Sequence, residues 1–196
     1  MSRDSPPDPE LWERVLSGDD RAFGSIFDRH RDRVYRHVCW LGAERTDAED
    51  LTATVFLELW RRRTSASVVD ESLLPWLLAT ANNVSRNATR SRHRYRRFLA
   101  ALPLSDHAPD ASLVAEERVE AQYRGAALAR AAQSLSLKDQ QLITLVTLEE
   151  LSLEQVSQAL GISYGAAKTR LSRARKRLDA FYAANSIDSA RFGVTP

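Results

Sequence analysis

The side chains best suited to a chemical task stand on one predicted helix near the C-terminal end of the 196-residue chain. At 100° per residue, this helix carries hydroxyl and cationic side chains opposite its apolar face. Arginine is the usual partner of guanine in the major groove, hydroxyls reach base edges, and flanking cations bind phosphates without reading sequence. The pattern therefore predicts recognition of duplex DNA. The residues predicted to contact it are Lys168, Thr169, Arg170, Ser172, Arg173 and Lys176.

Two short helices around a tight turn are predicted to position that surface. Ser152 and Gln155 form an S-x-x-Q capping box at the start of the first helix. Gly161 ends that helix, because glycine tolerates the left-handed conformation of a C-terminal turn, and Ser163 can cap the second. A solvated amphipathic helix would explain the charge, but the capped pair with its turn favours a helix-turn-helix. The predicted core face of the second helix is Tyr164, Ala167, Leu171, Ala174 and Leu178.

A second polar stripe lies on a long helix that is predicted to have Pro75 in its first turn. No acidic residue occurs between Ser85 and Ser105. A solvated face explains any single arginine equally well, but the whole stripe favours nucleic-acid binding. The apolar face of this helix holds Leu74, Leu77, Ala81, Val84 and Ala88. Its opposite face holds Asn83, Arg86, Asn87, Arg90, Arg94 and Arg97.

An acidic helix is predicted to begin near residues 46–47 and reads TDAEDLTATVFLELWRRR. Acids in its first turn and arginines in its last turn complement the helix dipole. Its buried stripe is predicted to hold Leu51, Val55 and Leu59, with Phe56 at the edge. Core packing accounts for the apolar residues, but it does not explain why an acidic, partly apolar helix accompanies so much arginine.

Composition limits the class of protein. Hydrophobic residues make up 43% of the chain, with only 7 Gly and 7 Pro, which predicts a packed, all-helical fold. The net charge is only +2, so the basic residues are clustered and offset by acidic segments elsewhere. Cys39 is the single cysteine, which excludes an internal disulfide and favours a reducing compartment. The N-terminus has no signal-peptide pattern and no run is long enough to span a bilayer, so we expect a cytoplasmic protein without membrane insertion.

The fold class predicted is all-α, with two small helical domains joined by a flexible linker and the helix-turn-helix in the C-terminal one. Residues 102–111 hold two prolines and two aspartates, which favours a linker. A loose tail covers residues 1–9, a short helix begins at Leu11, and a further helix over residues 135–146 is capped by Ser136. The predicted divisions are an N-terminal tail and short helix over 1–18, a first domain over 19–100, a linker over 101–113, a second domain over 114–184 and a tail over 185–196.

Enzymatic and metal-binding functions are not favoured. His30, His37 and Cys39 lie on one helix, but their spacing is not that of a zinc site and no second ligand pair exists. The sequence has no carboxylate cluster at metal spacing, no glycine-rich phosphate loop and no Ser–His or Cys–His arrangement. We therefore expect no catalytic residue, metal or cofactor.

Four blocks of the chain, in order, resemble the sigma factors of the extracytoplasmic-function group, the compact two-domain members of the sigma-70 family. Together they cover most of residues 19–178, and the second and fourth are specific in combination. The blocks are DDRAFGSIFDRHRDRVYRHV, DAEDLTATVFLELWRR, PWLLATANNVSRNATRSR and LSLEQVSQALGISYGAAKTRLSRARKRL.

The resemblance implies partners and roles. The acidic helix would dock on the clamp helices of the largest subunit of bacterial core RNA polymerase through Asp47, Glu49, Asp50, Leu51, Phe56 and Trp60. The helix after Pro75 and the loop before it would capture an unstacked base of the minus-ten promoter element. The residues implied there are Trp76, Asn83, Arg86, Asn87 and Arg90. The family's minus-thirty-five contacts fall on Lys168, Thr169, Ser172 and Arg173.

Two further points follow from the resemblance. The loop over residues 64–72 lacks the aromatic residue that often stands there in the family. Family members are usually held inactive by an anti-sigma factor, often anchored in the membrane, so such a partner is expected here, with the protein otherwise acting at the nucleoid.

Three other classes of function compete with this interpretation. A helix-turn-helix regulator acting without polymerase would dimerise and bind a palindrome, but it leaves the acidic helix and the Asn/Arg stripe unexplained. A nuclease would require the catalytic constellations that the sequence lacks. A pure protein-interaction module would make two basic faces superfluous.

Overall fold

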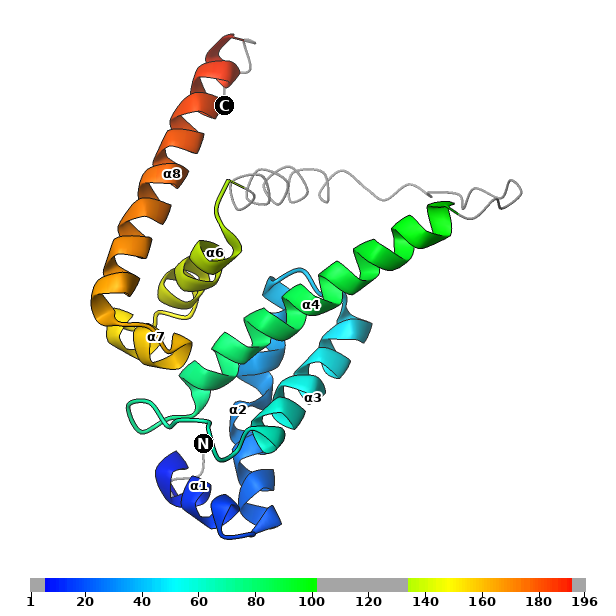
Figure 1. Cartoon of the computed structure of the whole chain (residues 1–196), viewed down its shortest axis with the longest axis vertical. Coiled ribbons are helices and arrows are strands. Elements are labelled where there is room, and N and C mark those ends of the chain that lie inside the picture. Colours follow the sequence, from blue (N-terminus) through cyan, green and yellow to red (C-terminus); the bar gives the residue numbers. More distant parts are fainter. Residues whose placement is uncertain (1–5, 102–133, 192–196) are drawn as a thin grey trace.

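Helices make up most of the computed structural model, which describes residues 6–101 and 134–191 (Figure 1). Within those ranges the only strand-like pairing is an isolated bridge between Val69 and Ser72, which confirms the all-α prediction. The predicted linker from residue 102 on, and the part of the second domain up to residue 133, lie outside the described residues. The helices are α1 (Asp8–Leu16), α2 (Asp20–Trp40), α3 (Arg45–Arg61), α4 (Leu74–Ala101), α6 (Leu137–Ile143), α7 (Leu153–Leu160) and α8 (Tyr164–Arg191), with a π-helical turn η1 (Thr144–Leu148) after α6.

Helices α1–α4, which we call the first unit, enclose one apolar cluster. The α2 N-cap is Asp19, whose side chain accepts from the amides of Arg21 and Ala22. Helix α1 begins at Asp8 rather than at Leu11, so the predicted loose tail is too long. The reason is that α1 packs on α2 and buries three apolar side chains in the same cluster. These are Leu11, Trp12 and Val15.

Helices α6–α8 with η1, which we call the second unit, surround a second and smaller apolar cluster. It is built on Leu142, Leu145 and Val156, together with residues of α8. Two α4 residues, Leu78 and Ala79, belong to this second cluster, although their neighbour Leu77 lies in the first. The sequence analysis assigned α4 a single apolar face. In the structure α4 has two, because α7 packs against its N-terminal half (Figure 1).

The helix-turn-helix forms as predicted. Ser152 and Gln155 make the full capping box, Gly161 is left-handed with φ of 62°, and the Ser163 hydroxyl accepts from the Ala166 amide. Of the predicted core face of α8, the side chains of Ala167, Leu171 and Ala174 are buried and that of Leu178 is partly buried. Tyr164 is 53% exposed, so its assignment to the core is wrong. It is the first residue of α8 and precedes the part of the helix that packs in the core.

Helix α8 continues to Arg191, whereas the sequence analysis placed a tail after residue 184. No Gly or Pro interrupts the chain there before Gly193, so nothing local ends the helix earlier. Among the described residues, no helix combines the length and apolar character needed to cross a membrane.

Candidate nucleic-acid and protein interfaces

The residues of α8 that are predicted to read DNA form an open surface. Five of the six side chains are exposed, and Arg170 is partly buried. The Thr169 hydroxyl donates to the Gly165 carbonyl at 2.9 Å, so towards a base it presents an acceptor. The exposed members are Lys168, Thr169, Ser172, Arg173 and Lys176.

The polar stripe of α4 is only partly open. Asn83, Asn87 and Arg90 are exposed. Arg86 is partly buried, and its Nη2 donates to Asn83 Oδ1 at 2.7 Å, which orients the amide. Trp76 is partly buried against the first cluster, so its ring also serves the core. The stripe therefore offers two amides and a cation to an incoming strand, with Arg86 as a support for one of them.

The acidic helix α3 presents Glu49 and Asp50 to solvent, whereas Asp47 forms an ion pair with Arg92 of α4 at 2.7 Å. Leu51 is partly buried at the edge of the first cluster. Two carboxylates and the edge of an apolar side chain thus remain available to a partner, while Asp47 also joins α3 to α4.

The assignment of Phe56 to a partner-binding face is wrong. Its side chain is 3% exposed and packs edge-to-face on Phe27, with ring centroids 4.7 Å apart. Buried positions at 52, 55, 56 and 59 follow the helical period and place it in the core. Trp60 is partly buried: its ring lies 5.1 Å from that of Phe23, and the Arg63 guanidinium stands 4.8 Å from its centroid.

The loop before α4 ends in a strained turn. Val69 and Ser72 exchange two backbone hydrogen bonds, of 2.8 and 3.0 Å, around Asp70 and Glu71. Both central residues have positive φ, 50° and 58°, the pattern of a type I′ turn made without glycine. Because such backbone is costly for residues with a Cβ, surrounding contacts must hold it in place.

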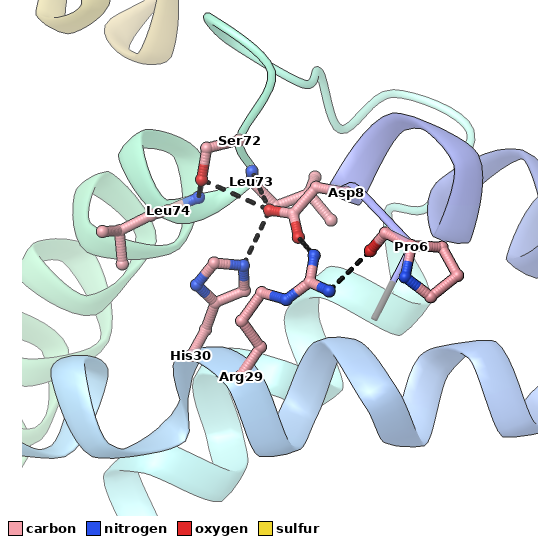
Figure 2. Close-up of polar contacts among 7 residues, drawn as sticks. All are labelled: Pro6, Asp8, Arg29, His30, Ser72, Leu73 and Leu74. Atoms are coloured by element: carbon pink, nitrogen blue, oxygen red, sulfur yellow. Dashed lines mark hydrogen bonds and ion pairs between the residues drawn. The ribbon is translucent and has the colours of Figure 1, made fainter. Parts of the chain in front are cut away.

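Asp8 provides one of those contacts and was missed by the sequence analysis (Figure 2). Its Oδ2 accepts from the Leu73 amide at 2.8 Å, from His30 Nε2 at 2.7 Å and from the Ser72 hydroxyl at 3.2 Å. Its Oδ1 accepts from Arg29. The carboxylate therefore ties α1, α2 and the start of α4 together at the end of the strained loop. Partners about 20 and 65 residues away leave no local signal in the sequence.

The ionisation of Asp8 follows from these contacts. Burial by itself would raise the pKa of this carboxyl, but hydrogen bonds from His30, the Leu73 amide and Arg29 outweigh it and lower the pKa to about 2. The carboxylate is therefore charged throughout the range in which the protein would work.

A second buried carboxylate joins the two units. Glu149 lies between η1 and α7, and it accepts from Arg33 Nε at 2.6 Å and from His37 Nδ1 at 2.7 Å, both on α2. Burial opposes its charge, but hydrogen bonds from His37 and Arg33 lower its pKa. His30 and His37, weighed above as metal ligands, thus each bond a carboxylate. Within residues 6–101 and 134–191 no three His, Cys, Asp or Glu side chains gather as a metal site would require.

Two family regions match this chain. The sequence model described as sigma-70 region 2 matches residues 26–95, which span most of α2, α3 and most of α4. The model described as sigma-70 region 4 matches residues 125–178, which include the helix-turn-helix.

Individual relatives belong to one functional group. The ECF RNA polymerase sigma factor BldN of Streptomyces coelicolor is 31% identical over 86% of this chain and 63% of its own length. The ECF RNA polymerase sigma factor SigE of Mycolicibacterium smegmatis is 30% identical over 89% of this chain and 68% of its own. The chain therefore spans slightly less than two thirds of BldN and slightly more of SigE.

A third relative adds a solved structure. The RNA polymerase sigma factor CnrH of Cupriavidus metallidurans is 28% identical over 91% of this chain and 98% of its own. A structure of CnrH in complex with the cytosolic domain of CnrY aligns with a TM-score of 0.58 and 25% identity, covering 90% of this chain and 97% of that chain. This chain therefore shares its fold with CnrH over most of the length of both proteins.

Proposed function

This chain belongs to the RNA polymerase sigma factors of the extracytoplasmic-function group, and we propose that it binds bacterial core RNA polymerase and directs it to promoters. The observation that carries the proposal is the presence on one chain of three separate open surfaces. They are the acidic face of α3, the Asn/Arg face of α4 and the DNA-reading face of α8. A DNA-binding regulator acting alone has no use for the first two.

The proposed division of labour follows the chain. Residues 19–100 bind polymerase and the minus-ten element, residues 114–184 bind the minus-thirty-five element, and residues 101–113 link them. Opening the duplex costs a few kcal/mol per unstacked base, which capture of the flipped base offsets. Each DNA contact is weak alone, and the two become effective when one polymerase holds both units, because binding of the first raises the effective concentration of the second. The free protein therefore binds DNA weakly and with strong salt dependence. No step of this mechanism is catalytic.

We further propose control by an anti-sigma protein. CnrH, which shares the fold, was solved in complex with the cytosolic domain of CnrY. A corresponding partner of this chain would hold it in the cytoplasm or at the membrane until a signal releases it.

The first experiment is co-elution of the full chain with bacterial core RNA polymerase on a sizing column. We expect a stable one-to-one complex. Asp50→Arg, on the exposed face of α3, abolishes it, whereas Asp28→Arg, equally exposed on α2, is the matched control and leaves it intact. If the wild-type chain forms no complex but binds duplex DNA tightly, it is an ordinary helix-turn-helix regulator.

A second variant separates the two units. Arg173→Ala on α8 weakens transcription from promoters that depend on the upstream element and leaves polymerase binding unchanged. If polymerase binding falls equally, the assignment of polymerase contacts to the first unit is wrong.

A further inference from the structure

The contact between the two units contains one buried charge. The Glu149 side chain is only 5% exposed, and both of its partners belong to the first unit, more than 100 residues away in sequence. Arg33 and His37 stand one helical turn apart on α2, so their side chains converge on the same carboxylate. A buried carboxylate that lost them would retain the cost of burial without compensation. Glu149 is therefore accommodated only while the units are packed together.

One partner of Glu149, His37, is itself held by α4. A carboxylate only accepts, so His37 Nδ1 carries the proton. His37 Nε2 then accepts from the Asn82 amide at 3.1 Å, and the same amide donates to the Leu78 carbonyl at 3.0 Å. We call Glu149, Arg33, His37 and Asn82 the Glu149 latch. It joins the second unit to α2 and α4 through a connected set of hydrogen bonds.

The units also share the apolar cluster around Leu78 and Ala79, and two further hydrogen bonds join them. Gln155 of α7 donates to Asp70 of the strained loop at 2.8 Å, at an exposed site. Gln141 of α6 donates to the Ala79 carbonyl at 3.0 Å. Glu150, directly after the latch residue, has a positive φ of 56°, so the backbone beside the latch is strained and is held in place by its contacts.

The same interface is incompletely packed. A cavity of about 700 Å³ lies between α4, α6 and α8, lined by residues including Asn82, Leu137 and Tyr182. At its α4 wall, Ser85 Oγ and Arg86 Nε are buried, and neither has a hydrogen-bond partner in the part of the chain that the structure describes. The pocket is partly open to solvent, and buried polar atoms without a partner are rare in a permanent core. Both features fit a contact that forms and breaks.

The docked arrangement also brings the two DNA-reading surfaces close together. Asn83 lies about one helical turn after Ala79, and Ser172 directly follows Leu171, while Ala79 and Leu171 share one apolar cluster. Helix α7 packs on both α4 and α8. Two helix-packing distances of about 10 Å and one helical turn of about 5 Å therefore put the two surfaces within roughly 30 Å of each other. The minus-ten and minus-thirty-five elements, about 25 base pairs apart by their names, are separated by roughly 85 Å of duplex. A docked chain cannot contact both.

We propose that the Glu149 latch holds the protein in a closed state that has to open before both promoter elements can be bound. In a holoenzyme on a promoter, the two units must lie far enough apart to contact both promoter elements. Because the closed state does not allow this, the strength of the latch sets the fraction of chains that are open and able to bind polymerase. The competition with polymerase rests on the proposed function, whereas the latch itself rests only on the contacts above.

The test compares two latch variants with two matched controls, all in the full-length chain. Glu149→Gln and Arg33→Gln weaken the latch from its two sides. Glu150→Gln and Arg36→Gln change exposed neighbours on the same segments. Small-angle X-ray scattering gives the radius of gyration, and circular dichroism checks the helix content. We expect a larger radius in both latch variants, an unchanged radius in both controls, and a rise in the open fraction of about tenfold.

The functional readout is the apparent Kd for bacterial core RNA polymerase, which falls by the same factor in the latch variants. If the radius of gyration rises in neither latch variant, the proposal that the latch holds the closed state is wrong. If both expand and their affinity for polymerase does not rise, the competition with holoenzyme formation is overturned. Failure of the wild-type chain to bind polymerase would instead overturn the proposed function, and the scattering result would still decide the latch.

Discussion

Asp8 and Glu149 are held by the same chemistry in two different regions of the molecule. Each is a buried carboxylate that accepts from one arginine and one histidine of α2. Asp8 also accepts a backbone amide and lies between helices that share one core. Within residues 6–101 and 134–191 no backbone amide donates to Glu149, and one of its partners in the other unit, Arg33, is 42% exposed. Identical side-chain chemistry therefore builds a permanent joint in one place and a releasable one in the other, because the surrounding packing differs.

The largest effect should come from truncating adjacent leucines of α4. Leu77 and Leu78 are both fully buried, but in different clusters. Leu77→Ala should lower the free energy of unfolding of the first unit by about 4 kcal/mol, whereas Leu78→Ala should mainly promote opening. All four tryptophans belong to the first unit, and only Trp40 of them lines the pocket towards the second unit. Urea unfolding followed by tryptophan fluorescence therefore reports mainly on the first unit. Equal losses in that assay would show that the two clusters are not separable.

Asp8→Ala tests the permanent joint. It leaves His30 and the Leu73 amide buried without their acceptor and should cost the first unit about 3 kcal/mol by the same fluorescence assay. Glu10→Ala, at an exposed site on α1, is the control and should change little. Glu149→Gln should leave this transition unchanged. If it lowers the stability of the first unit as much as Asp8→Ala does, the contrast between the two carboxylates is wrong.

Acid should weaken both joints, and a different readout reports on each. The pKa of Asp8 is lowered from 3.8 to about 2, so the stability that it contributes is present above pH 4 and is lost as pH falls towards 2. The loss should amount to about 2 kcal/mol and should be missing in Asp8→Asn. The pKa of Glu149 is lowered from 4.5, so closure also weakens as pH falls below that range. Scattering should detect expansion on acidification in the wild-type chain and not in Glu149→Gln.

Salt should have the smallest effect. Raising the ionic strength from about 0.1 M to about 1 M shortens the screening length from about 10 Å to about 3 Å. The half-exposed Arg33 side of the latch should weaken, raising the open fraction about twofold, while the fully buried Asp8 should be insensitive. The acid-unfolding midpoint reports on Asp8, and the radius of gyration reports on the Glu149 latch. If salt shifts both, the two carboxylates do not differ in their sensitivity to salt.

The parts of the fold that depend on local contacts were predictable. Ser152 with Gln155, Gly161, and the cap at Ser136 each involve residues within a few positions of one another, and all are observed. The exposed face of α8 followed from helical period alone. Asp8, Glu149 and the second apolar face of α4 were not predictable, because their partners come from distant segments whose pairing only the folded chain reveals.

Phe56 shows a different kind of error. A resemblance assigns a role to a position in a motif, but it does not say which atoms of that position reach the surface. The helical period of α3 placed the side chain at the edge of the buried stripe, and its packing on Phe27 shows that the period was the better guide. The exposed acids of the same motif, Glu49 and Asp50, remain predictions of a polymerase-binding face.

The membership of α4 in two clusters has a consequence for how long the protein survives in a cell. When the second unit leaves, Leu78 and Ala79 of α4 lose the side chains that cover them and become exposed to water. Exposed apolar surface of this kind promotes self-association and recognition by chaperones and proteases. We therefore expect the closed state to resist degradation and an opened chain without polymerase to be degraded faster.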